Sequence, residues 1–86
     1  MYKVVKRDGK IADFDIHKIS SAIQKAFDAC GRNYDSSVLD LIALRVTSDF
    51  EPKAKDGFIG VEDIQDSAEK VLSEAGYSDV AKAYIL

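Results

Sequence analysis

The sequence predicts a small α+β domain in which an N-terminal β-hairpin packs on a bundle of about four helices. The hairpin is predicted by a β-rich segment at residues 2–6, followed by the turn signal Asp8-Gly9 and a second apolar run. The helices are predicted because apolar residues recur at helical spacing in four separate stretches beyond residue 15. A chain of 86 residues suffices for one domain, residues 1–86, with an adequate core.

The hairpin and the first helix follow each other closely. We expect Tyr2–Lys6 to pair with a returning run around Ile11 and Phe14. Asp15 then stands at the predicted N-cap of a helix, because its carboxylate can accept hydrogen bonds from the first helical N–H groups. Gly31 is expected to end this helix as its C′ residue. The apolar stripe between them comprises Ile16, Ile19, Ile23, Ala26, Phe27 and Cys30.

A second helix is expected to begin at Asp35 or Ser36 and to end before Pro52. Leu41 and Leu44 widen its apolar face, so that the helix is apolar around much of its circumference. We therefore expect it to lie at the centre of the core. The other members of the apolar face are Leu39, Ile42, Val46 and Phe50.

The segment Phe58-Ile59 is short and apolar, and it is a candidate third strand beside the hairpin. Gly60 leads into a third helix, which we expect to end at Gly76. This helix places acidic residues in its first turn, where they favour the helix dipole. Its apolar stripe comprises Ile64, Ala68, Val71, Leu72 and Ala75.

The last segment is expected to be a helix capped by Ser78 or Asp79. Its apolar pattern is still helical at Leu86, and no C-cap residue follows. We therefore expect the sequence to be a piece of a longer chain.

Composition excludes several function classes. The net charge is -3, and basic residues predominate only near the N-terminus, so a surface for duplex nucleic acid is not expected. No apolar stretch approaches the roughly 20 residues of a membrane span, and a cytoplasmic setting is expected. One cysteine and one histidine cannot build a disulfide or a metal cluster. No nucleophile accompanies His17, and no catalytic motif is found, so we expect a non-enzymatic domain.

The basic residues near the N-terminus form a candidate anion site. Lys6 ends the first strand, Arg7 follows it in the turn, and Lys18 falls in the first turn of the following helix. The N–H groups of such a turn have no partner within the helix, so phosphate is expected to meet them together with the three cations. The alternative is that these charges only make the hairpin soluble.

An apolar recess beside this anion site would accommodate a base. Ile19 and Ile23 are expected to line it. Asp15 can accept a hydrogen bond from an exocyclic amine or a sugar hydroxyl, although N-capping is its competing role. Together these features favour a nucleotide as the ligand.

Four segments, in their order and spacing, resemble the ATP-cone family. They are Val4-x-Lys6-Arg7-x-Gly9, Phe14-Asp15-x-x-Lys18-Ile19, Val61-x-Asp63-Ile64 and Val80-Ala81-Lys82-Ala83-Tyr84-Ile85. ATP-cones are regulatory nucleotide-binding modules, best known at the N-terminus of ribonucleotide reductases. The resemblance covers essentially the whole chain. It implies one allosteric site for ATP or dATP, with Mg²⁺, that sets overall reductase activity through nucleotide-dependent assembly.

The resemblance also implies roles for individual residues. Lys6 and Arg7 match the basic pair that contacts phosphate, and Lys18 matches a lysine near the phosphates. Asp15 matches the position that reads the adenine amine, and Gln65 matches a position near the ribose. The implied partners are an adenine nucleotide, the remainder of the parent reductase and a second copy of the chain.

The resemblance leaves two alternatives open. The same module occurs in a bacterial repressor of reductase genes, behind a zinc ribbon. A degenerate cone would instead serve only as a helical interaction domain. The family pattern continues past Leu86 with basic residues, so we expect weaker nucleotide binding by residues 1–86 alone.

Overall fold

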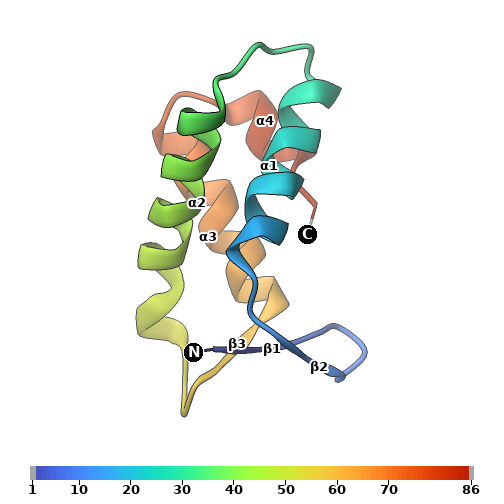
Figure 1. Ribbon diagram of the computed structural model, residues 1–86, viewed down its shortest axis with the longest axis vertical. Helices are drawn as coiled ribbons and strands as arrows, with labels where there is room; N and C mark the ends of the chain where they lie inside the picture. Colours follow the sequence, from blue (N-terminus) through green and yellow to red (C-terminus); the bar gives the residue numbers. More distant parts are fainter. Residues whose placement is uncertain (1, 86) are drawn as a thin grey trace.

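The computed structural model describes residues 2–85. A three-stranded sheet lies at one end of the molecule, three long α-helices extend away from it, and a fourth, short helix lies toward the opposite end (Figure 1). The predicted α+β class, with its hairpin and four helices, is therefore confirmed.

The sheet has the strand order β2-β1-β3. Strand β1 (Lys3–Val5) pairs antiparallel with β2 (Ile11–Asp13) and parallel with β3 (Phe58–Gly60), so the candidate third strand is confirmed. The hairpin loop closes through backbone hydrogen bonds from Gly9 N to Lys6 O (2.9 Å) and from Lys6 N to Lys10 O (2.8 Å). The φ angle of +85° at Gly9 explains why glycine follows Asp8, because other residues seldom adopt this conformation.

Helix α1 (Ile16–Ala29) begins and ends as the sequence predicts. Asp15 is its N-cap and accepts a hydrogen bond from His17 N, and Gly31 has a positive φ of 66° after the C-cap. The N–H of Arg32 donates to Phe27 O (3.0 Å), which satisfies a carbonyl that the helix end leaves open.

Three further helices complete the bundle: α2 (Ser36–Phe50), α3 (Val61–Glu74) and α4 (Ser78–Ala83). A short 3₁₀ turn, Glu51–Lys53, follows α2. Helix α2 packs against α1 and α3, and α4 also packs against both of these helices. The core lies between the four helices and includes Ile23, Phe27, Ile42, Val46, Phe50, Ile64, Leu72 and Val80.

The expectation that α2 is buried on most sides was wrong. Leu41 and Leu44 are 58% and 59% exposed. Only the stripe that includes Ile42 and Val46 faces α1 and α3, and no element of residues 2–85 covers the opposite side of the helix.

The last helix also differs from its prediction. Tyr77, rather than Ser78 or Asp79, is the N-cap of α4, and it has no side-chain capping bond. The helix ends at Ala83 because Tyr84 turns into extended backbone, with ψ at 126°. The predicted helical continuation is therefore wrong at Tyr84 and Ile85, and Leu86 lies outside the described residues.

Three aromatic rings join the sheet to α2. Tyr2 and Phe14 flank the paired strands, and their ring centroids lie 6.0 and 5.6 Å from that of Phe50 in edge-on geometry. Such pairs contribute beyond the area they bury. They hold the sheet against the lower end of the bundle, where the cavity described next is found.

Candidate functional site

A cavity of about 490 Å³ lies between the sheet, the start of α1 and the start of α3. Its apolar wall consists of Val4, Ala12, Phe14, Ile19, Val61 and Ile64. Its polar wall consists of Lys6, Arg7, Asp8, Asp13, Asp15 and Lys18. A mainly apolar recess with a few charged groups is typical of small-molecule sites.

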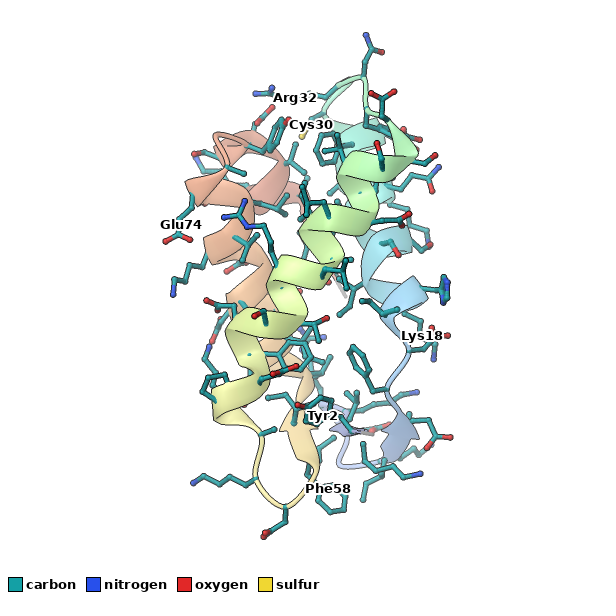
Figure 2. The ribbon with its side chains drawn as sticks, turned by 60° about the vertical axis from the view of Figure 1, so that its left-hand side comes forward. Tyr2, Lys18, Cys30, Arg32, Phe58 and Glu74 are labelled. Carbon is teal, nitrogen blue, oxygen red and sulfur yellow. The ribbon has the colours of Figure 1, made fainter. Side chains whose placement is uncertain are left out.

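Three cations from two elements converge on this cavity. Lys6 and Arg7 belong to the hairpin, where the bond from Lys6 N to Lys10 O fixes the end of the strand. Lys18 belongs to the first turn of α1, at the end of the helix nearest the sheet (Figure 2). The fold therefore brings the three basic residues predicted from the sequence to one cavity.

The helix amides are less available than the sequence indicated. Asp15 Oδ1 accepts from His17 N (2.9 Å), and Asp15 O accepts from Lys18 N (3.0 Å). The expectation that phosphate meets the free N–H groups of this turn is therefore corrected, because Asp15 already satisfies two of them. Side-chain cations remain the main groups for an anion here.

Asp15 is ionised while it caps the helix. The hydrogen bond from the His17 backbone lowers the pKa of this carboxyl, and Lys18 adds a smaller electrostatic contribution. Within residues 2–85, hydrogen bonds reach only its Oδ1 atom, from His17 N and His17 Nδ1. Oδ2 can accept a further hydrogen bond, so capping and ligand contact are compatible.

The other acids of the cavity wall also have structural partners. Asp13 pairs with Lys3 across the β1–β2 ladder, and this lysine lowers the pKa of the Asp13 carboxyl. Asp8 Oδ1 accepts from Lys10 N (2.9 Å) within the hairpin turn. These carboxylates therefore shape the hairpin while their charges stay near the cavity.

An ion pair joins the hairpin to α3 at the edge of the cavity. Arg7 Nε lies 4.0 Å from Glu62 Oε1 in the first turn of α3, and both side chains are more than half exposed. Val61 and Ile64 of the same helix end line the cavity beside it. Arg7 therefore lines the cavity and also pairs with Glu62 at its edge.

Two of the candidate residues lie elsewhere. Ile23 is fully buried in the core, one turn beyond Ile19, because it faces the other helices rather than the sheet. Gln65 Nε2 donates to Tyr84 O (2.7 Å) and to Glu69 Oε1 (3.2 Å), so that its amide faces the end of α4. The structure therefore does not bring Ile23 or Gln65 to the cavity wall with Lys6, Arg7, Asp15, Lys18 and Ile19.

Of the apolar wall, only Ile19 was predicted from the sequence as a site residue. Val4 and Ala12 lie opposite each other in the β1–β2 ladder and face the helices. Strand alternation could have assigned both to one face. Val61 and Ile64 come from a helix far along the chain, and no local signal places them beside the hairpin.

A family model described as "ATP cone domain" matches residues 2–86. The chain is an ATP-cone domain. The family match accords with the hairpin, the helix order and the basic cavity described above.

The ATP cone is similar to parts of several reductases. It is 39% identical over 89 residues to a "Ribonucleoside-diphosphate reductase subunit alpha" of Chlamydia pneumoniae, covering 96% of this chain and 8% of that protein. It is 38% identical over 86 residues to a "Vitamin B12-dependent ribonucleoside-diphosphate reductase" of Mycobacterium tuberculosis, covering 98% of this chain and 11% of that protein.

A third relative is an "Anaerobic ribonucleoside-triphosphate reductase" of Haemophilus influenzae. The cone is 34% identical to it over 84 residues, which cover 98% of this chain and 12% of that protein. The chain therefore spans only 8% to 12% of the length of these three relatives.

Residues 2–85 contain neither a membrane-spanning helix nor a metal-binding cluster. None of the described helices has the length and apolar character needed to span a bilayer. No group of three or more His, Cys, Asp or Glu side chains in the same residues is arranged to hold a metal ion.

Proposed function

We propose that this ATP cone binds ATP or dATP in the cavity between the sheet, α1 and α3, and that it regulates a cytoplasmic ribonucleotide reductase. The observation that carries the proposal is the convergence of Lys6, Arg7 and Lys18 on a mainly apolar cavity. The family and the reductase relatives support the same function.

The cavity has a basic part, which would hold the phosphates, and an apolar part, which would hold the base. Phosphate oxygens would contact Lys6, Arg7 and Lys18, because charge-assisted hydrogen bonds from these groups are strong. We expect Mg²⁺ to be held mainly by the phosphates, as in most nucleotide sites. The described residues supply no metal-binding cluster of their own.

The base would occupy the apolar part. Phe14, Ile19 and Ile64 supply surfaces against which a purine can pack. Asp15 Oδ2 would accept from the adenine amine, while Oδ1 continues to cap α1. A guanine presents a carbonyl oxygen at that position and would be repelled by the carboxylate.

Regulation requires that the nucleotide favour one state of the parent protein over another. The cavity joins the hairpin to the starts of α1 and α3, so a bound nucleotide would tie these three elements together. We propose that this ordering changes how the domain meets the remainder of the reductase or a second copy of the chain. The domain itself would carry out no catalytic step.

Calorimetric titration with ATP, dATP and GTP tests the binding proposal. We expect saturable binding of ATP and dATP and none of GTP. Lys6→Ala should weaken ATP binding by about 10-fold or more, since hydrogen bonds to charged groups contribute roughly 1.5–3 kcal/mol. Lys10→Ala is the matched control, because this lysine is in the same hairpin but does not line the cavity. Absence of adenine-nucleotide binding, or equal losses in the two variants, would contradict the proposal.

The regulatory part needs the full-length parent protein. We expect its reductase activity and its state of assembly to respond differently to ATP and dATP. Lys6→Ala in the full chain should reduce that response while leaving activity without effector unchanged. A response that persists fully in the variant would place regulation at another site.

A further inference from the structure

Glu62 differs from the other acids near the cavity in its partner. Asp8, Asp13 and Asp15 each have a structural partner in Lys10 N, Lys3 and His17 N, respectively. The partner of Glu62 is instead the cavity cation Arg7, with Nε and Oε1 4.0 Å apart. Glu62 therefore balances a charge that a ligand phosphate would also use.

The backbone keeps Glu62 at the edge of the cavity. Gly60 ends β3 and is the N-cap of α3, so Glu62 falls in the first helical turn between the cavity residues Val61 and Ile64. Its side chain is 81% exposed and that of Arg7 is 52% exposed, so both can move without disturbing the core. The Glu62 carboxylate can therefore leave Arg7 without disturbing the core.

We propose that Glu62 is an affinity-setting residue that competes with the nucleotide phosphates for Arg7. The inference rests on the proposed nucleotide function and adds a determinant of phosphate-chain recognition to it. In the empty domain Glu62 is an ion-pair partner of Arg7. On binding, phosphate replaces it, and the displaced carboxylate remains close enough to repel the phosphate chain.

This repulsion depends on the charge of the ligand. It is largest for a free triphosphate, smaller for a diphosphate and smallest for a monophosphate, which carries the least charge near Arg7. Mg²⁺ neutralises part of the phosphate charge and should reduce the effect. Glu62 thus restrains triphosphate affinity and makes it sensitive to magnesium.

The test compares Glu62→Gln with wild type by titrating ATP, ADP and AMP at about 0.1 M salt, first without and then with Mg²⁺. Asp66→Asn is the matched control, since it removes one negative charge from an exposed position one turn further along α3, away from the cavity. The NMR signal of Arg7 Nε, recorded without ligand, reports directly on the ion pair.

We expect Glu62→Gln to tighten ATP binding about two- to fivefold, the range that exposed ion pairs commonly contribute. The gain should fall from ATP to ADP to AMP and should shrink with Mg²⁺, while Asp66→Asn stays near wild type. Weaker MgATP binding in Glu62→Gln would identify a magnesium ligand instead and overturn the competition. Equal effects on all three nucleotides, or an unmoved Arg7 signal together with unchanged ATP affinity, would also overturn it. If wild type binds no adenine nucleotide, the proposed function itself fails, which is a separate result.

Discussion

Replacing Tyr84 with phenylalanine is expected to stabilise the domain. Tyr84 is 1% exposed, and within residues 2–85 its hydroxyl has no hydrogen-bond partner. The contact from Gln65 Nε2 goes to the backbone oxygen of Tyr84, so the substitution leaves it in place. A buried unpaired hydroxyl costs about 1–3 kcal/mol, whereas its removal leaves a void of one oxygen atom. We expect the free energy of unfolding to rise by about 1 kcal/mol and Tm by about 4–8 °C.

Thermal and urea unfolding measure this change. Tyr34→Phe is the matched control, because the Tyr34 hydroxyl accepts from Gln24 Nε2 (2.8 Å) and the same deletion there removes a hydrogen bond. The free energy of unfolding of Tyr34→Phe should equal that of wild type or be slightly lower. A Tyr84→Phe variant that is less stable than wild type by 1 kcal/mol or more would refute the reasoning, because it would show that the hydroxyl is hydrogen-bonded in solution.

The same hydroxyl predicts a dependence on alkaline pH. Burial raises the pKa of Tyr84 above its ordinary value. The unfolded chain then releases this proton at lower pH than the folded chain, so the contribution is present below about pH 10 and is lost as pH rises above it. The slope for one such group is up to about 1.4 kcal/mol per pH unit. Tyr84→Phe should lack this part of the alkaline loss.

Three further variants test the fold. Gly9→Ala should destabilise by about 1–2 kcal/mol in urea unfolding, because φ is +85° there even though no atom lies within 4 Å of the added Cβ. Replacing Leu41 and Leu44 together with lysine should leave the free energy of unfolding within about 0.5 kcal/mol of wild type, because both face solvent; a large loss would mean that another surface covers them. Asp79→Asn should lower Tm at neutral pH because the hydrogen bond from Arg32 depresses the pKa of Asp79. That contribution is present above about pH 4 and is lost as pH falls further, so the difference from wild type should vanish in acid.

Signals that act within one turn of chain predicted several element ends, although not those of α4. Asp8-Gly9 predicted the hairpin, Asp15 predicted the start of α1, and Gly31 and Gly76 predicted two helix ends, since φ is 66° and 91° at these glycines. Each depends on a backbone conformation or a capping bond that the residue itself provides.

Burial and site membership depend on residues that are distant in the sequence, and they were predicted less well than the element ends. Helical periodicity placed Leu41 and Leu44 on a broad apolar face, but it could not show that the neighbours of α2 cover only one side. The same limit applies to the site. Lys6, Arg7 and Lys18 are close in sequence and could be grouped, whereas the surroundings of Gln65 depend on where α4 ends, because its amide donates to Tyr84 O.

The parallel pairing of β1 with β3 has a consequence for how the domain acquires its site. Lys3 and Phe58 are 55 residues apart along the chain, and α1 and α2 lie between them. Closing so long a loop is entropically costly, and contacts of this kind tend to form late in folding. During synthesis, the hairpin and α1 can form before β3 and α3 exist, but the cavity cannot. Nucleotide binding would therefore be absent from chains made only as far as α2 and would report that β3 and α3 have joined the hairpin.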